Sequence, residues 1–535
     1  MSFFPILKLD DFIASLADDV KADILAWRLN KKKAALRLRE ALPTLFDLSY
    51  VENAILPAIV TSVFQGERHD LPMIDLKFTK EEALPFFFWG MLYDSWEPEL
   101  EKGLSVFIQG YENRGEENRR KRLYASALTP DLYRPMYGEK VVDFFDQLLS
   151  TSNANRPLMA SYYDTYFDLY WDLHLGVKGE AIPDEVRQVG ESFNTVLAYV
   201  NPILDIVHDN YVRVRTLRKI LEDWVDARIE DMLQGKIPNP EKTFVYYWLK
   251  NGEQGPDFRR EDVVFECFHN FVALSQWGNT IYQIVSRLRT DDQGDPIIGE
   301  WFKRTMESDF DQPPTSATPS NPLEEWLKKL FGHGSDSLKS PVSPFTPLDR
   351  FVMELFRTIS PNDGSISLIE ETGNLTPLYQ RYGYIINPHS ETSRDPRHWL
   401  DPNEFNPDRY LTTPTSDQID EARAKEIGFA RCPFHKISLA VKDGRNAILT
   451  NSAFGTVFGV NENQSFPVCD YAGYAPFGFG YRRCPGELLT IEFVKDFLRK
   501  VWSDKVEFKT LDIDNPERVP VGPTAVVDDN IGFVR

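Results

Sequence analysis

The stretch PFGFGYRRCPGELL, residues 476–489, constrains this chain more than any other. Gly478, Gly480 and Gly486 permit tight backbone turns and close contact with a flat group, because glycine has no Cβ atom. Cys484 lies between the last two of these glycines, just before a segment with helical features. The stretch therefore predicts a tight loop that presents one thiol at the start of a helix.

The segment after Cys484 predicts a helix. Pro485 suits the first helical position, and Glu487 suits the first turn. The expected apolar face consists of Leu488, Leu489, Ile491, Phe493, Val494, Phe497 and Leu498. The helix dipole and a neighbouring cation, Arg482 or Arg483, would stabilise a thiolate. Such a thiolate suits a redox nucleophile or a metal ligand, and the alternative is a small buried hydrophobic residue.

Composition excludes several classes of protein. The 535 residues are 42% hydrophobic and 13% aromatic, which is enough for a large buried core. The four cysteines have unrelated spacings, predict neither a disulfide framework nor a zinc site, and favour a reducing compartment. Apolar runs are far shorter than the roughly 20 residues of a membrane-spanning helix, and early charges argue against a signal peptide. The formal charge of -21 argues against nucleic-acid binding. We therefore expect a soluble, cytoplasmic protein without a transmembrane anchor.

The cysteine loop resembles the haem-binding loop of the cytochrome P450 family. The matching positions are Phe477, Gly478, Gly480, Arg482, Cys484 and Gly486. The resemblance implies haem b (iron protoporphyrin IX) as cofactor, with the Cys484 thiolate as the ligand of the metal. It also implies that Phe477, Arg482 and Gly486 contribute to cofactor binding. A thiolate ligand donates electron density to iron and favours cleavage of an O–O bond.

Two upstream segments extend the resemblance. Glu354 and Arg357 are three residues apart, so on a helix they project from one face. The segment from Ser393 to Leu411 is similar to the one in which the family places a second arginine, and Arg409 matches that residue. The resemblance implies a structural network of Glu354, Arg357 and Arg409 that supports the haem loop, because unpaired buried charges are costly.

A basic segment near residue 120 resembles the early helix of the family that contacts the haem. In NRRKRLYASALTP, Arg122 matches an arginine expected to bind a haem propionate. Asn118 stands where the family usually has an aromatic residue or histidine. We expect both residues to bind the cofactor, and the remaining basic residues suit an exposed helix face equally well.

The predicted distal helix departs from the pattern of oxygen-activating members. The segment from Val263 is a long helical stretch, but no carboxylate lies between His269 and Thr280. An acid followed by a threonine usually relays protons there. If Thr280 aligns with the threonine, Asn279 takes the place of the acid. If the alignment shifts by three residues, Gln276 and Trp277 occupy the two places.

Prostacyclin synthase and allene oxide synthase carry an amide side chain where an oxygen-activating member has the threonine. The segment SQWGN of this chain resembles them in this respect. These relatives rearrange peroxides, which already contain the O–O bond and need no proton relay or electron supply. The plant enzymes of this type have a lengthened cysteine loop, whereas the cysteine loop of this chain has the ordinary length. A structural role is an equal alternative for the three polar residues Ser275, Gln276 and Asn279. Their side chains would then be hydrogen-bonded to backbone carbonyls or to water.

The predicted architecture is one haem-thiolate domain over residues 1–535, mainly α with a small β-rich portion, in the cytochrome P450 fold. Pro/Ser-rich and unusually long connections predict surface insertions near 306–346 and 412–470. Cys432 and His435 have the spacing of half a metal site, but an ordinary loop explains them better.

The expected activity is O2-dependent monooxygenation of a mostly apolar small molecule, with Thr280 as proton relay and a separate redox partner. The alternative is a hydroperoxide isomerase, dehydratase or peroxygenase that needs no redox partner, with Asn279 or Gln276 orienting the peroxide. A haem-binding protein without turnover is a third class.

Overall fold

The computed structural model describes residues 15–27, 29–41, 56, 75–77, 126–199, 205–252, 260–312, 345–359, 364–369, 383–388, 393–396, 398–411, 457–461, 464–467, 474, 476–477, 484, 486–522 and 525–535. Most of the two expected insertions, near 306–346 and 412–470, lies outside these residues, so both stay predictions.

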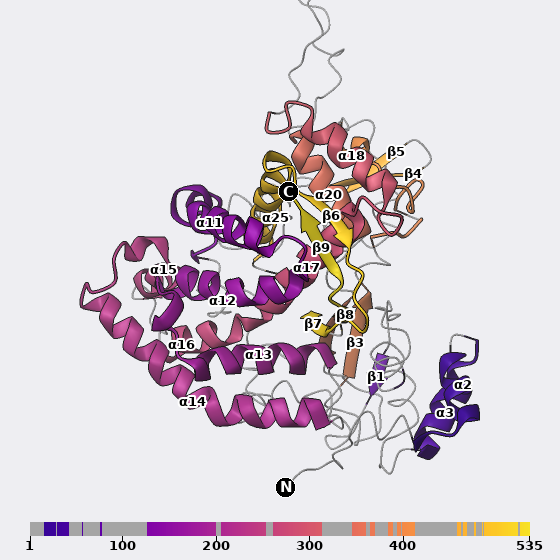
Figure 1. Cartoon of the computed structure of the whole chain (residues 1–535), viewed down its shortest axis with the longest axis horizontal. Coiled ribbons are helices and arrows are strands. Elements are labelled where there is room, and N and C mark those ends of the chain that lie inside the picture. The colour runs from indigo at the N-terminus through magenta and orange to yellow at the C-terminus, as the bar shows by residue number, and fades with distance from the viewer. Residues whose placement is uncertain are drawn as a thin grey trace, which may run out of the picture.

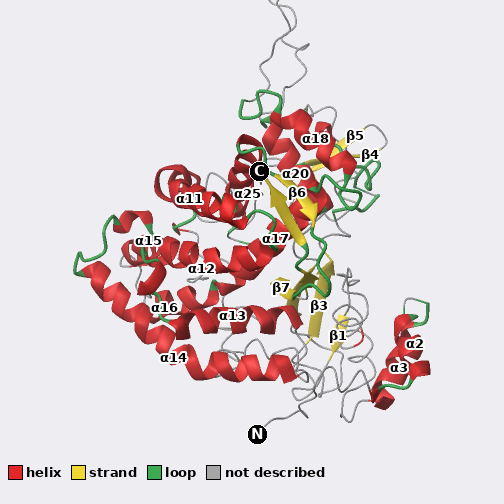
Figure 2. Cartoon of the chain, viewed as in Figure 1, coloured by secondary structure: helices red, strands yellow, loops and turns green. Residues whose placement is uncertain are grey.

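Helices dominate the described part of the chain (Figures 1 and 2). The helices that position the site are α11 (Gly138–Leu148), α12 (Leu158–Leu175), α13 (Asp184–Tyr199), α14 (Asp205–Leu233), α16 (Arg260–His269), α17 (Phe271–Leu288), α18 (Pro296–Met306), α20 (Pro347–Thr358) and α25 (Glu487–Ser503). The others are α2 (Asp18–Leu25), α3 (Lys31–Ala41), α10 (Pro130–Leu132) and α15 (Phe244–Gly252). The described helices include none that is long and apolar enough to cross a membrane.

The strands form small antiparallel sheets. One sheet has the order β1-β3-β2, and the others are the pairs β4-β5, β6-β9 and β7-β8. Their bounds are β1 (Asp75–Lys77), β2 (Gly364–Ile369), β3 (Gly383–Pro388), β4 (Phe458–Asn461), β5 (Gln464–Pro467), β6 (Glu507–Thr510), β7 (Arg518–Gly522), β8 (Ala525–Asp528) and β9 (Ile531–Val534). The predicted fold class, mainly α with a small β-rich portion, is confirmed, whereas the single domain stays a prediction.

Aromatic side chains hold α11, α12, α17 and α25 together around one core. Trp277 of α17 stacks on Phe493 of α25, with ring centroids 4.0 Å apart. Phe145 of α11 contacts the same Phe493 ring at 4.8 Å, and Tyr166 of α12 meets Trp277 edge to face at 5.8 Å. Such large buried rings contribute much of the apolar area that stabilises a core. The cysteine loop therefore leads into a helix that packs on α11 and α17.

The long helical segment expected from Val263 is divided into α16 and α17 at Asn270. The Tyr170 hydroxyl of α12 donates to the Cys267 carbonyl at 2.6 Å and so satisfies an acceptor in the last turn of α16. The Asn270 side chain does not cap α17, and instead its Nδ2 lies 3.2 Å from Nε2 of His174 on α12. The break thus depends on contacts with α12.

The hairpin of β7 and β8 packs between α13 and α17 (Figure 1). The Asn194 side chain of α13 donates from Nδ2 to the Pro520 carbonyl of β7 at 2.8 Å. Asp529, just after β8, accepts from the Met159 and Ala160 backbone N–H groups at 3.0 and 2.8 Å. A carboxylate distant in sequence thus caps α12, whose own N-cap, Pro157, has no side-chain acceptor.

Candidate functional site

Cys484 lies just before α25, ahead of the N-cap residue Gly486. Its side chain is half-buried and packs against the main core. Its backbone N–H donates to the Phe477 carbonyl at 2.9 Å, and the Phe477 ring contacts Phe356 of α20 at 4.9 Å. The described ends of the loop are thus held by α20 and α25. The helix begins at Glu487 with Gly486 as N-cap, slightly later than the sequence suggests.

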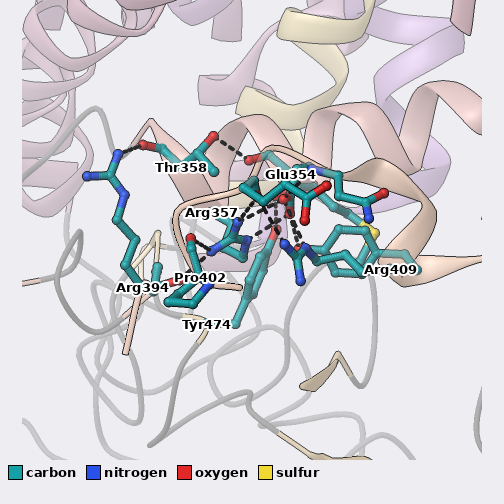
Figure 3. Close-up of polar contacts among 12 residues, drawn as sticks. Glu354, Arg357, Thr358, Arg394, Pro402, Arg409 and Tyr474 are labelled. Carbon is teal, nitrogen blue, oxygen red and sulfur yellow. Dashed lines mark hydrogen bonds and ion pairs between the residues drawn. The ribbon is translucent and has the colours of Figure 1, made fainter. Parts of the chain in front are cut away.

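The structure brings Glu354, Arg357 and Arg409 together (Figure 3). Glu354 and Arg357 have no exposed surface. Glu354 Oε1 accepts from Arg357 Nη2 at 2.8 Å and from Arg409 Nε at 3.0 Å. Glu354 Oε2 accepts from Arg357 Nε at 2.8 Å and from the Tyr410 hydroxyl at 3.0 Å. The carboxylate is therefore surrounded by donors, as a buried charge requires.

Arg357 connects α20 to the segment that carries Arg409. Its Nη1 donates to the carbonyls of Ser393 and Pro402, at 3.1 and 2.7 Å. Its Nη2 also donates to the Glu404 carbonyl at 2.9 Å. Together with the two bonds to Glu354, these contacts use the five N–H groups of a guanidinium. The segment is therefore held on the helix that also contacts Phe477.

Sequence reasoning overlooked two further members of this network. The Asn406 backbone N–H donates to Glu354 Oε1 at 2.8 Å, and the Tyr410 hydroxyl donates to the same carboxylate. Burial, followed by the nearby Glu354 charge, raises the pKa of the Tyr410 phenol, which therefore keeps its proton. Tyr410 directly follows Arg409 in the short helix Pro407–Tyr410, and that proximity is the signal that would have identified it.

Thr280 lies on the side of α17 that faces α20 and α25. A small cavity between these helices is lined by Thr280, Ile284, Leu355, Phe356, Ile359 and Val494. Thr280 is the one polar side chain in this lining, and its hydroxyl donates to the Gln276 carbonyl at 2.8 Å. Phe356 also contacts Phe477, so the cavity lies beside the cysteine loop.

Asn279 lies on a different side of α17. It is fully buried and packs against Gly522 of β7, where an added Cβ atom would lie 3.0 Å from the Asn279 Cβ. The Gln283 side chain lies 3.5 Å from its Oδ1. Gln276 is half-buried, one turn before Thr280. The structure therefore does not place Asn279 and Thr280 in one cluster.

Trp277 is occupied by packing on α25. Its indole N–H donates to the Thr490 hydroxyl at 2.9 Å while its ring stacks on Phe493. The shifted alignment would assign the position of the distal threonine to this indole. The contacts give Trp277 a structural role and favour the alignment based on Thr280.

The described residues fit a haem at its thiolate end. A half-buried thiol at a helix start, beside an aromatic ring and a cavity, provides a soft single ligand suited to iron. Arg482, Arg122 and Asn118, which are also expected to bind the cofactor, lie outside the described residues. Their roles stay predictions.

No family model matches the sequence, and no curated protein matches it. A comparison with solved structures finds a zebra fish cytochrome P450 with progesterone, which is 13% identical. The match covers 90% of this chain and 99% of that chain, with a TM-score of 0.50. The chain has the cytochrome P450 fold.

Other P450 structures are also similar to this chain. A cyanobacterial CYP120A1 bound to retinoic acid is 16% identical, with 82% of each chain covered and a TM-score of 0.48. A variant of cytochrome P450 OleT in complex with arachidonic acid is 14% identical, with 81% of this chain and 79% of that chain covered and a TM-score of 0.44. The fold assignment rests on the zebra fish structure.

Proposed function

We propose that this chain is a haem-thiolate oxidoreductase that acts on a mostly apolar small molecule. The observation that carries the proposal is the position of Cys484, at the start of α25 in a P450 fold. Bound haem b would supply the redox chemistry, and a thiolate ligand would increase electron density at its iron. Cys484 would hold the cofactor from the loop, and Phe477 would contact it from the same side.

The leading reaction is O2-dependent monooxygenation. Thr280 supports it, because its hydroxyl is the polar group of a cavity beside the cysteine loop. A hydroxyl there can accept a proton from a donor and pass one on without a change of charge. The residue would thus hold a proton at Oγ1 near the reacting centre. A separate redox partner would supply electrons.

The alternative reaction is rearrangement or use of an organic hydroperoxide. The absence of a carboxylate between His269 and Thr280 in the sequence favours it, because a substrate that already contains the O–O bond needs no proton relay. A fixed amide such as Asn279 or Gln276 would orient the peroxide without proton transfer. This reaction requires neither reductant nor redox partner.

Cys484→Ala tests the haem-thiolate assignment. The reduced wild-type protein under carbon monoxide should show the red-shifted Soret band of thiolate ligation, and the variant should lose it. Cys267→Ala is the matched control, because Cys267 is a buried thiol of α16. Persistence of the band in Cys484→Ala would refute the assignment.

Thr280→Ala and Asn279→Ala distinguish the two reactions. In a monooxygenase, Thr280→Ala should keep the haem but divert reductant to hydrogen peroxide. In a peroxide-using enzyme, Asn279→Ala should slow the consumption of fatty-acid hydroperoxides without reductant. Loss of about 2–3 kcal/mol in the transition state corresponds to roughly a 30–150-fold slower rate. Arg287→Ala, at an exposed position of α17, is the control. Unchanged activities in both test variants would exclude this part of α17 from the distal site.

A further inference from the structure

Trp277 joins the helix that carries Thr280 to the helix that follows Cys484. Its indole ring stacks on Phe493 of α25, with ring centroids 4.0 Å apart and ring planes inclined by 20°. Its N–H donates to the Thr490 hydroxyl at 2.9 Å, and both side chains are buried. A ring contact limits how closely two helices approach, and a directional hydrogen bond limits how they rotate. Trp277 therefore fixes α17 against α25.

Contacts with α12 hold this part of α17 from another side. Tyr166 of α12 meets the indole of Trp277 edge to face at 5.8 Å. The next residue of α17, Gly278, permits the close approach of α12, because an added Cβ atom would lie 2.4 Å from the Tyr163 hydroxyl. The indole thus contacts α12 and α25 at the same time, so packing determines its orientation.

The hydrogen bond of Trp277 reaches α25 close to the cysteine. Thr490, its acceptor, lies in the first turn of α25, and the Thr490 backbone N–H donates to the Gly486 carbonyl at 2.9 Å. Gly486 is the N-cap of α25 and follows Cys484 by two positions. One turn of regular helix therefore separates the indole contact from the segment that carries the thiol.

The ring contact of Trp277 lies beside the small cavity between α17, α20 and α25. Thr280, one helical turn after Trp277, and Val494, next to Phe493, both line this cavity. The stacked pair of Trp277 and Phe493 thus separates the two helices next to the cavity walls that they contribute. Movement of the indole would change the distance between these walls.

We propose that Trp277 is a positioning residue that sets the spacing between the Thr280 turn of α17 and the cysteine end of α25. The inference rests on the proposed function, in which Thr280 and Cys484 act at one haem. A displacement of about 1 Å far from the chemistry can slow a reaction roughly 100-fold, so a rigid spacer between these helices affects more than stability. Trp277 acts through α25 and Thr280. If it served packing alone, its contacts would influence melting but not the site.

Thr490→Val and Thr490→Ser test the hydrogen bond while the indole stays in place. Valine keeps the shape of threonine without an acceptor, whereas serine keeps the hydroxyl. The probes are imidazole and its phenyl derivative, which bind ferric haem and differ in size, so the ratio of their dissociation constants reports the room above the cofactor. We expect Thr490→Val to change this ratio by about tenfold, as for a displacement of a fraction of an ångström. Thr490→Ser should restore the wild-type ratio.

Trp277→Phe removes the same hydrogen bond from its donor side. Phenylalanine keeps a ring that can stack on Phe493, and the ratio should again depart from that of the wild type. Adding Thr490→Val to Trp277→Phe should change the ratio little further, because the two substitutions remove one shared interaction. Thr305→Val is the matched control, since Thr305 is a buried threonine in the last turn of α18, and it should keep the wild-type ratio.

The carbon monoxide band of thiolate-ligated haem separates failure of this inference from failure of the proposed function. A wild-type protein without the band would refute the proposed function. If the band is present and both Thr490→Val and Trp277→Phe keep the wild-type ratio, Trp277 is not a positioning residue, whatever their melting temperatures. If Thr490→Val does not fold, the ratio measured for Trp277→Phe decides between the two roles.

Discussion

At the scale of single residues, Arg357 is the most constrained side chain of the Glu354 network. Its exposed fraction is 0%, and each of its N–H groups donates to Glu354 or to a backbone carbonyl. Arg357→Ala should lower the free energy of unfolding by about 3–5 kcal/mol, because it leaves the Glu354 charge buried without this partner. Arg357→Lys should be intermediate, since an ammonium group has fewer donors and no planar fork.

Thermal melting and the yield of soluble protein would measure these effects. Arg260→Ala is the control, because Arg260 pairs with Asp226 and Glu230 at the surface, where the expected change is below about 1 kcal/mol. An Arg357→Ala protein that melted with the wild type would show that the network does not support the fold.

At the scale of elements, α12 depends on a carboxylate far away in sequence. Asp529 is 1% exposed and accepts from the first backbone N–H groups of α12. Asp529→Ala should destabilise the protein by about 1–2 kcal/mol, as expected for loss of an N-terminal cap. Asp529→Asn should cost less, because the amide keeps one acceptor oxygen.

Hydrogen exchange of the first amides of α12 would locate this effect, and thermal melting would measure its size. Asp514→Ala, in the exposed connection between β6 and β7, is the control. If exchange at Met159 and Ala160 were unchanged in Asp529→Ala, the capping role would be wrong.

At the scale of the whole molecule, the burial of His174 links folding stability to pH. Burial lowers the pKa of His174 from its ordinary 6.5 to about 3. Its Nδ1 donates to the Tyr170 carbonyl at 2.7 Å, so Nε2 is the acceptor for Asn270. Between pH 6.5 and 3 the unfolded chain binds a proton that the folded protein does not, so stability falls as pH falls. The contribution is up to about 1.4 kcal/mol per pH unit.

Urea unfolding of the wild type and His174→Gln at about pH 7, 6, 5 and 4 would isolate this contribution. Other carboxylates titrate in the same range, but they are common to both proteins. The wild type should lose more stability than the variant on acidification. If the stabilities of the two proteins fell in parallel with pH, His174 would have the same pKa in the folded and unfolded states, and the proposed effect of its burial would be wrong.

Local patterns determined much of what the sequence predicts about this protein. The glycines before Cys484 and the apolar spacing after it predict the loop and α25, because backbone sterics and helical periodicity act over a few residues. Glu354 and Arg357 lie one helical turn apart, so a local argument also places them on one face. The mainly α fold class, by contrast, is implied by the resemblance to the cytochrome P450 family.

Only the tertiary structure decided which residues meet across the fold. The cap of α12 by Asp529 and the division of the distal segment at Asn270 depend on distant contacts. So do the surroundings of Thr280, which faces a cavity, and of Asn279, which packs on β7. Residues hundreds of positions apart are brought together by packing of large side chains such as Trp277 on Phe493. A helical pattern specifies an apolar face but not the partner helix, because the free energy of burial depends on buried area and not on which chain segment covers it.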